Sequence, residues 1–299
     1  MQTGRSGRVT RPGRPARPPE RAVAGSDCAA AFQAMARDCL AQMQAACSGT
    51  IAGHAEALHQ MRVAISRLRA TIAFFAPMTS DAAWRKLKKE LAWLYAILGD
   101  ARDADVMSAL RRRKRYREWA AQIGMHDDSE NREIHRRVVA AIRSKRFRRL
   151  LDALLGWVEL GPWLTRRDDD GPRMRAEPLR AYSQRKLERW RMRLIRKGHG
   201  LATMDGKLRH RLRIKVKRYR YVLEALGETC PPGTRSKLRH LHKPAKRLQR
   251  SLGDLRDLQR LRAGASKRPP GYRKQKKELL AAARAALHDI KRPRSLPPF

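Results

Sequence analysis

Apolar residues recur every three or four positions along most of the chain, and this spacing predicts α-helices. An early stripe predicts a helix from Asp27, as its N-cap, to about Cys47, with core positions at Phe32, Met35, Cys39 and Met43. The alternation of apolar and polar residues that is typical of strands is not sustained over any long segment. The pattern predicts an all-α protein.

The same spacing predicts the remaining helices and one break between them. Pro77 should end the helix that begins near His54, Ser80 or Asp81 should cap the next one, and Asp205 should cap a later one. The expected helices span about 54–76, 81–98, 104–122, 129–157, 179–196, 205–230, 234–263 and 271–291. Residues 161–172 interrupt all periodicity, so they should form a hinge between two halves.

Two segments of the sequence recur in a similar form later in the chain. His59–Arg69 (HQMRVAISRLR) returns as His210–Arg220 (HRLRIKVKRYR), at an offset of 210 − 59 = 151 residues. Leu98–Asp103 (LGDARD) returns as Leu252–Asp257 (LGDLRD), at an offset of 252 − 98 = 154. Because the order and nearly the spacing are kept, the chain contains an internal duplication.

Each copy of the first repeat has a basic face and an apolar face when it is wound as a helix. Four polar positions fall within an arc of about 80° in each copy. They are His59, Arg62, Ser66 and Arg69 in one copy and His210, Arg213, Lys217 and Arg220 in the other. Neither arc contains a carboxylate, although opposite charges would stabilise an ordinary surface helix. This arrangement predicts a site for an anion with several charges.

The repeated segments also resemble a known family. LHQMRVAISRLRATIAFF and LRHRLRIKVKRYRYVLEAL are similar to the two signature helices of the CHAD domain, a histidine-containing α-helical domain often found beside triphosphate-tunnel enzymes. LAWLYAILGDARDADV, at 91–106, resembles a further motif of the family. The resemblance covers roughly residues 27–292. It implies two pseudo-symmetric antiparallel four-helix bundles around a basic central cavity that binds inorganic polyphosphate.

Composition narrows the possible partners. The 299 residues include 69 Lys and Arg against 28 Asp and Glu, which gives a formal net charge of +41. Such an excess favours a polyanionic partner: nucleic acid, polyphosphate or an anionic membrane. No apolar run is long enough to span a bilayer, and no apolar stretch follows the basic N-terminus, so we expect neither a membrane partner nor a secretory signal. The four cysteines lack metal-binding spacing, which indicates reduced thiols in a cytoplasmic protein.

The expected organisation has three parts. Residues 1–26, rich in Pro, Gly and Arg, should be a disordered basic arm. Residues 27–292 should form the CHAD domain, with halves at about 27–160 and 173–292, and residues 293–299 should be a frayed tail.

The candidate site combines positions that match the family motif with neighbouring cations. The motif positions are His59, Arg62, Arg67, Arg69, His210, Arg213, Lys217, Arg218 and Arg220, and the neighbours are Lys88 and Lys246. Arg offers a planar fork of donors that suits phosphate oxygens, and Lys adds mobile point charges. The histidines could contact the anion, bind a metal or act as acid and base; the surrounding arginines would repel a metal, so we expect anion contact. We therefore predict no metal and no cofactor.

The predicted function is non-catalytic binding of inorganic polyphosphate, in the cytoplasm and in association with polyphosphate granules. Ser66 and Ala92 occupy the positions at which the second half has Lys217 and Lys246. Because the first half lacks these two positive charges, it should bind the ligand less strongly. One alternative is a basic protein that binds nucleic acid without sequence specificity, and another is a metal-dependent phosphohydrolase that uses His59 and His210. The preferred chain length, the cellular role, the role of the basic tails and the oligomeric state remain open.

Overall fold

The chain folds into helices throughout the part that the structure describes. The computed structural model describes residues 27–112, 128–167, 170–229, 232–264 and 271–292. The helices are α1 (Cys28–Ala45), α2 (Cys47–Ile51), α3 (Ala55–Phe74), α4 (Ala76–Thr79), α5 (Ala82–Arg112), α7 (Asp128–Arg143), α8 (Lys145–Leu160), η2 (Pro162–Leu164), α9 (Gly171–Ala176), α10 (Leu179–Gly198), α11 (Gly206–Thr229), α12 (Pro232–Gly264) and α13 (Tyr272–Lys291). The described ranges contain no strand, only an isolated bridge between Asp27 and Pro178. The all-α prediction is confirmed.

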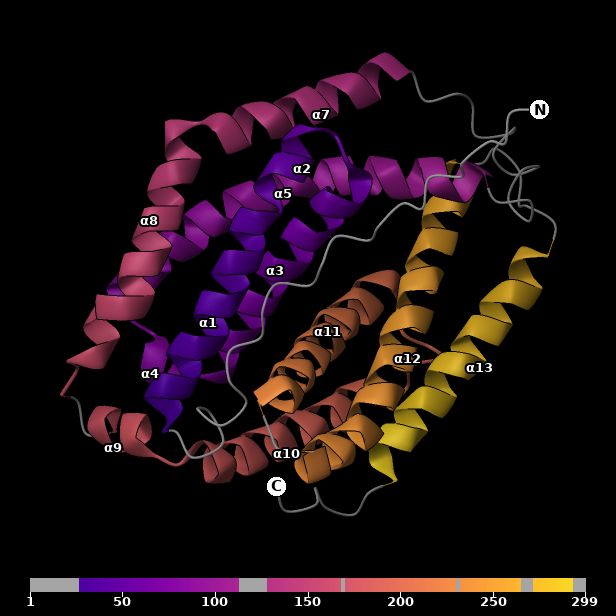
Figure 1. Cartoon of the computed structure of the whole chain (residues 1–299). Coiled ribbons are helices and arrows are strands. Elements are labelled where there is room, and N and C mark those ends of the chain that lie inside the picture. Colours follow the sequence, from indigo (N-terminus) through magenta and orange to yellow (C-terminus); the bar gives the residue numbers. More distant parts are fainter. Residues whose placement is uncertain (1–26, 113–127, 168–169, 230–231, 265–270, 293–299) are drawn as a thin grey trace, which may run out of the picture.

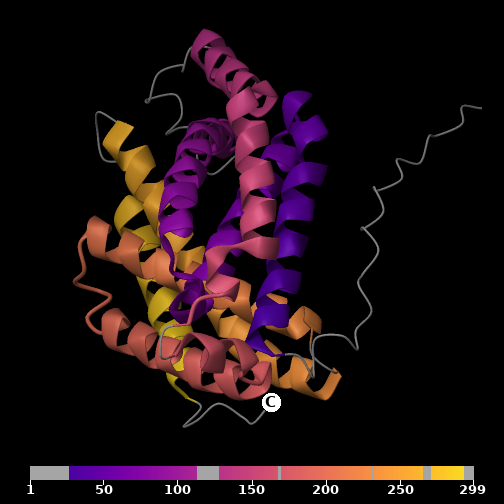
Figure 2. The same ribbon diagram turned by 90° about the vertical axis from the view of Figure 1, so that its left-hand side faces the viewer.

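The helices gather in two groups that follow the order of the chain. Helices α1, α3, α5, α7 and α8 pack on one another, and α10, α11, α12 and α13 form the second group, as Figures 1 and 2 show in indigo to magenta and in orange to yellow. The groups meet chiefly where α3 packs against α11. The division near the predicted hinge is therefore visible, whereas a twofold relation between complete bundles stays a prediction.

One hydrophobic core nevertheless serves both groups. Its buried residues run from Cys28 in α1 to Ile290 in α13. At the junction, the Tyr182 ring of α10 stacks on Phe75 with centroids 5.5 Å apart, and its hydroxyl donates a 2.5 Å hydrogen bond to the Phe74 carbonyl. Because the core is shared, the two halves are held as one unit around the α3 and α11 contact.

Short polar side chains begin several helices, as the sequence indicated for three of them. Asp27 accepts a hydrogen bond from the Ala30 amide, Asp81 caps α5 and Asp205 caps α11. An N-cap of this kind stabilises a helix by about 1 kcal/mol. Ser144 is a cap that the sequence analysis missed: its hydroxyl accepts from the Phe147 amide and starts α8, so the single helix expected at 129–157 is two helices.

Two other expectations about helix ends were wrong. The chain does not leave the helical conformation at Ser48, because residues 47–51 form α2. Gly99 was expected to separate the helices at 81–98 and 104–122, but α5 passes through it without a break; α12 passes through Gly253, as the expected helix at 234–263 does. The aspartates of these segments consequently do not cap helices. The expected arm, the expected tail and most of the arginine-rich segment at 111–115 lie outside the described residues.

No helix in the described part of the chain is long and apolar enough to cross a membrane. Cys28 and Cys39 are buried free thiols and Cys47 is a half-buried one. Cys230 lies outside the described residues.

Candidate functional site

The basic faces of α3 and α11 meet at equivalent positions of the two repeats. The Lys217 ammonium of α11 donates a hydrogen bond of 2.9 Å to the Ser66 hydroxyl of α3. These two residues are 151 positions apart, which is the offset of the first repeat. A second lysine at position 66 would face Lys217 and repel it, whereas the Ser66 hydroxyl accepts a hydrogen bond from the Lys217 ammonium. One lysine at this contact therefore lies between the basic faces of both halves.

Tyr95 of α5 organises the cations on this side. Its hydroxyl lies 3.2 Å from the Ser66 hydroxyl and 3.4 Å from the Lys217 ammonium. The guanidinium groups of Arg62 and Arg69 lie over its ring, with their central carbons 4.4 and 5.3 Å from the centroid. Cation–π attraction of this kind stabilises each position by about 0.5–2 kcal/mol without neutralising the charge. The cations are thus held in place and remain available to an anion.

The glycine of each LGDxRD segment gives room to an arginine of the neighbouring signature helix. A Cβ atom at Gly99 would lie 3.1 Å from a terminal nitrogen of Arg62, and one at Gly253 would lie 3.4 Å from Nε of Arg213. Arg62 also donates a hydrogen bond of 3.1 Å to the Tyr95 carbonyl. The glycines therefore serve close approach of a side chain and not helix termination, which explains why they occur inside continuous helices.

The two histidines occupy matching environments. Burial lowers the pKa of His59, and Arg102 lowers it further. Burial likewise lowers the pKa of His210, and here Arg256 adds to the effect. Arg102 and Arg256 are equivalent positions of the LGDxRD repeat. Both imidazoles are therefore neutral at pH 7 in the absence of a ligand, and each can still donate one N–H to a phosphate oxygen.

A third matched contact completes the repeat. Arg69 lies over the ring of Tyr95, and its equivalent Arg220 donates a hydrogen bond of 2.8 Å to the Gln249 side chain. Tyr95 and Gln249 are themselves 154 positions apart. Equivalent positions of the repeats therefore meet where α5 packs on α3 and where α12 packs on α11.

Mutual repulsion is strong at the centre of this arrangement. Burial lowers the pKa of the Lys217 ammonium, Tyr95 opposes that change, and Arg213 and Arg62 lower it further. For Tyr95, burial raises the pKa, but Lys217 and Arg62 outweigh burial and bring it down to about 8. We use the name central cluster for His59, Arg62, Arg69, Arg102, His210, Arg213, Lys217 and Arg256. A bound anion would relieve the repulsion among its members.

Two side-chain nitrogens of the central cluster are buried without a hydrogen-bond partner. Nδ1 of His210 and Nε of Arg213 have no partner among the described residues. An unpaired buried donor destabilises the folded protein by about 1–3 kcal/mol. These atoms are therefore candidates for contact with a ligand.

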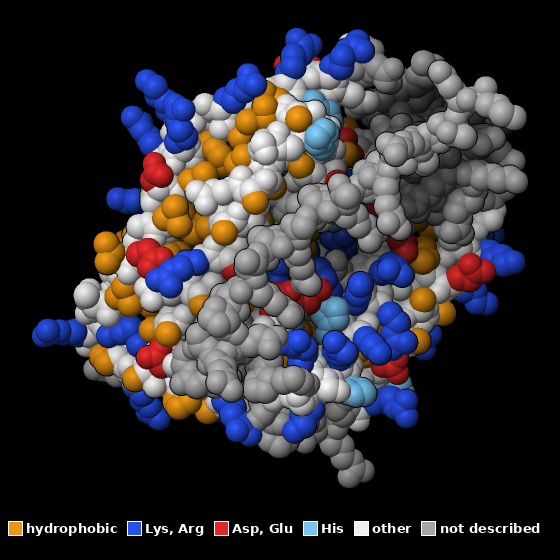
Figure 3. All heavy atoms as spheres, viewed as in Figure 1, with side chains coloured by type: hydrophobic (Ala, Val, Ile, Leu, Met, Phe, Trp, Pro, Cys, Tyr) orange, Lys and Arg blue, Asp and Glu red, His pale blue; other side chains and the backbone are white. Residues whose placement is uncertain are grey.

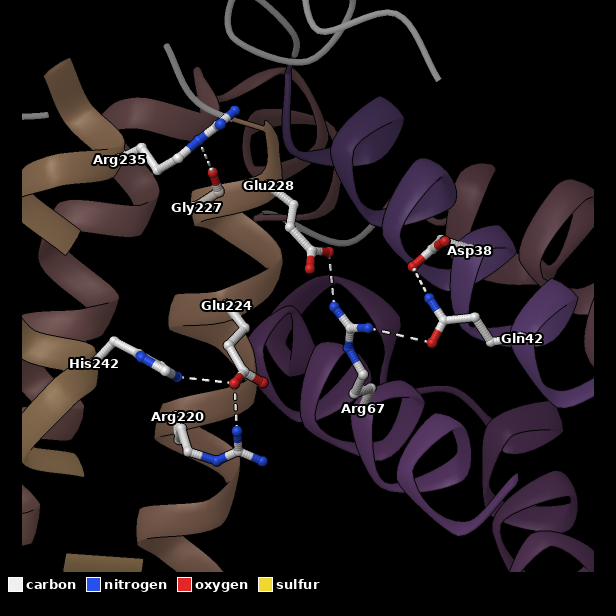
Figure 4. A network of polar contacts seen from close by, with 9 residues as sticks. All are labelled: Asp38, Gln42, Arg67, Arg220, Glu224, Gly227, Glu228, Arg235 and His242. Atoms are coloured by element: carbon white, nitrogen blue, oxygen red, sulfur yellow. Dashed lines mark hydrogen bonds and ion pairs between the residues drawn. The ribbon is translucent and has the colours of Figure 1, made fainter. Parts of the chain in front are cut away.

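Two predicted site residues already have carboxylate partners (Figure 4). Arg67 donates to Glu228 at 2.8 Å and to Gln42 at 3.2 Å, which ties α3 to α11 and α1. Arg220 pairs with Glu224, and that carboxylate also lies 2.8 Å from Nε2 of His242. Both acids follow the second repeat by one or two turns, so the charge count of the basic arcs did not include them. Arg67 in particular acts as a structural contact between the halves.

The aspartates of the LGDxRD segments take part in ion pairs. Asp103 of α5 lies 2.5 Å from Arg260 and 4.0 Å from Arg256, both of α12. Asp103 therefore pairs with arginines from the other half of the chain. The pair fixes α5 beside α12 next to both histidines.

The remaining predicted residues lie further out. Lys88 and Lys246 are exposed on α5 and α12, and no contact described for them links them to the central cluster. Lys246 lines a surface pocket of about 390 Å³ with Lys243, Arg247 and Arg250. Figure 3 shows Lys and Arg side chains gathered over this part of α12. Arg218 is half-buried on a different side of α11 from Lys217.

Arg102 and Arg256 of the central cluster, and Tyr95, which contacts its cations, were not predicted from the sequence. The repeat itself held the signal for the two arginines, because each occupies the same place in LGDxRD. Tyr95 could not be found in this way, because the equivalent position in the second repeat is a different residue, Gln249. Among the described residues, no three His, Cys, Asp or Glu side chains lie close enough together to hold a metal ion.

Comparison with known proteins finds a family and a similar fold. The family model of the CHAD domain matches residues 34–265. The crystal structure of the CHAD domain from the plant Ricinus communis is similar with a TM-score of 0.67 and 26% sequence identity, over 95% of this chain and 99% of that one. No curated protein sequence matches the chain significantly. With a family model that covers most of its length, the chain belongs to the CHAD domain family.

Proposed function

We propose that this protein binds inorganic polyphosphate at the central cluster without catalysing a reaction on it. The observation that carries the proposal is the convergence of matched His and Arg side chains from α3, α5, α11 and α12, with Lys217 between the two basic faces. A linear polyphosphate has about one negative charge per phosphate and no base to be read. Fixed cations are sufficient to bind such a chain, and Arg forks suit its oxygens.

Polyphosphate fits the cluster better than duplex DNA or RNA does. The cations of the cluster are partly buried where helices meet, and a duplex is too wide to reach side chains at that depth. A single unbranched phosphate chain is narrow enough to do so. Binding would place the protein on polyphosphate granules in the cytoplasm, which is part of the same proposal.

A competition titration tests the proposed ligand. Long-chain polyphosphate and duplex DNA, at equal phosphate concentration, are titrated into the purified protein at two salt concentrations. We expect tight polyphosphate binding that persists at the higher salt, with DNA released, because buried ion pairs are screened less than exposed ones. Equal affinities that fall together with salt would contradict the proposal. Phosphate release in the presence of Mg²⁺, lost in His59→Ala, would instead indicate a phosphohydrolase.

Tyr95 offers a spectroscopic test of where the ligand binds. Its pKa of about 8 is due to Lys217 and Arg62, which overcome the effect of burial. A polyanion bound to those cations would weaken their effect, so the pKa of Tyr95 should rise toward the ordinary value of about 10. The measurement is the near-ultraviolet absorbance of tyrosinate against pH, with and without polyphosphate.

Subtraction of the Tyr95→Phe variant isolates this phenol from the others. Burial raises the pKa of Tyr221, and of Tyr182 and Tyr219 as well, so these groups do not titrate in the same range. A Tyr95 titration that saturating polyphosphate leaves unchanged would mean that the ligand does not reach the central cluster.

A further inference from the structure

A second cationic surface lies between α10 and α11, outside the central cluster. We call it the α10–α11 track, and it consists of Lys186, Arg189, Arg193 and Lys197 of α10 with Lys215 and Arg218 of α11. Of these residues only Arg218 belongs to the signature motif. The two helices pack directly on each other, and Lys197 and Arg193 of α10 are close enough to Lys215 of α11 to lower its pKa.

The four α10 residues form a continuous stripe. At 100° per residue they fall within an arc of about 80°, and they extend over about 16 Å of helix. Arg189, Arg193 and Lys197 are exposed, whereas Lys186 is half-buried with its ammonium 5.8 Å from the ring centre of Tyr182. On α11, Lys215 and Arg218 lie on a side about 150° away from the arc that contains His210 and Arg213. Helix α11 thus presents cations on two separate sides.

The acidic residues of α10 and its N-terminal flank are committed to other arginines. Glu188 pairs with the buried Arg191, and Glu177 pairs with Arg185. Within the described part of the chain, neither carboxylate forms an ion pair with a cation of the α10 stripe. Burial, followed by the nearby charges of Arg189 and Arg193, lowers the pKa of Lys186 to about 8. The pKa of Lys215 is lowered in the same way, by burial and then by Lys197 and other cations.

The track is continuous with the central cluster through Arg69. This residue lies over the ring of Tyr95, which also contacts Lys217. Helix α3, which contains Arg69, packs on α11, and the charge of Arg69 lowers the pKa of the Arg218 guanidinium, after burial as the larger cause. Cations therefore follow one another from Lys217, by way of Arg69 and Arg218, to Lys215 and the α10 stripe.

We propose that the α10–α11 track binds the part of a polyphosphate chain that extends beyond the central cluster, so that long chains bind more tightly than short ones. The inference rests on the proposed function and assigns to it a preference for chain length. A flexible chain with a charge on every unit can turn from the central cluster past Arg69 onto α10. A compact anion can occupy only one of the two surfaces.

A triple variant tests the track. In Lys186→Gln/Arg189→Gln/Arg193→Gln, three contacts to phosphate are lost, and each contributes about 0.7 to the slope of log affinity against log salt for a single-stranded polyanion. We expect the slope for long-chain polyphosphate to fall by about two and the affinity to fall roughly tenfold. The affinity for a short polyphosphate, at equal phosphate concentration, should be unchanged because the central cluster is intact.

The control removes the same charge elsewhere. Lys145→Gln/Arg148→Gln/Arg149→Gln changes three exposed residues at the start of α8, the end of that helix that joins α7 and lies away from α10 (Figure 1). It should leave the preference for long chains intact. Far-ultraviolet circular dichroism confirms folding of both variants.

The outcomes separate this inference from the proposed function. If the wild-type protein binds neither polyphosphate, both proposals are wrong. If it binds both, but the triple variant is unchanged or loses short and long chains equally, the track proposal alone is overturned. Loss of duplex DNA affinity in the triple variant, with polyphosphate unaffected at both lengths, would make the track a nucleic-acid surface and would also overturn it.

Discussion

Replacing Arg62 and Arg213 together with glutamine is expected to weaken polyphosphate binding by at least about 100-fold. A hydrogen bond from a charged group contributes about 1.5–3 kcal/mol, so two such contacts contribute about 3 kcal/mol or more, and each 1.4 kcal/mol is a factor of ten. The two arginines are equivalent positions that pack against Gly99 and Gly253. Glutamine keeps a polar side chain but has neither the charge nor the reach. Isothermal titration calorimetry measures the change.

The matched control is Lys145→Gln/Arg148→Gln, which removes the same charge from an exposed segment of α8. Its affinity should remain within a few-fold of the wild-type value. Urea unfolding of both variants distinguishes a lost ligand contact from a lost fold, because Asp103 and Asp257 lie near the substituted arginines. A folded Arg62→Gln/Arg213→Gln protein with unchanged affinity would show that the central cluster is not the binding site.

Replacing Arg191 with methionine is expected to lower the free energy of unfolding by about 3 kcal/mol. The Arg191 side chain is 2% exposed, pairs with Glu188 at 2.6 Å and donates a hydrogen bond of 3.1 Å to the Ile290 carbonyl. Truncating one partner of a buried ion pair lowers stability by about 3–5 kcal/mol. We expect the lower end because Glu188 is partly exposed and can be hydrated. Methionine fills a similar volume, so the loss reports on the polar contacts that join α10 to the end of α13.

Arg189→Met is the control for this measurement, since Arg189 is exposed on the same helix. Substitutions at such positions change stability by about 0.5 kcal/mol or less. Equal urea midpoints for the two variants would contradict the structural role assigned to Arg191.

Much of the fold follows from local information in the chain. The apolar period of 3.6 residues located most helices, and the short acidic side chains of Asp27, Asp81 and Asp205 marked three of the starts. These signals are local because a cap or an apolar stripe depends on residues only a few positions apart. Ser144 was missed because nothing in the flanking pattern distinguishes a serine that caps from one that continues a helix.

The glycine segments show where local reasoning failed. A glycine inside a helical pattern often marks an end, and Gly99 was interpreted in that way, although Gly253 was placed inside a continuous helix. Their actual role is to admit Arg62 and Arg213 from another helix. That contact joins positions far apart in the chain, so it has no local signature. Only the repetition of LGDxRD indicated that the segment had a specific role.

The sequence by itself determined the helical class, the duplication and the positions of most central cations, since the offset of 151 residues aligns His59 with His210 and Arg62 with Arg213. Tertiary structure decided which cations remain available. Glu228 neutralises Arg67 and Glu224 neutralises Arg220, whereas Tyr95 holds Arg62 and Arg69 without removing their charge. The physical reason is that helical faces follow from spacing along one segment, but the neutralisation of a charge depends on which distant side chains packing brings within a few ångströms.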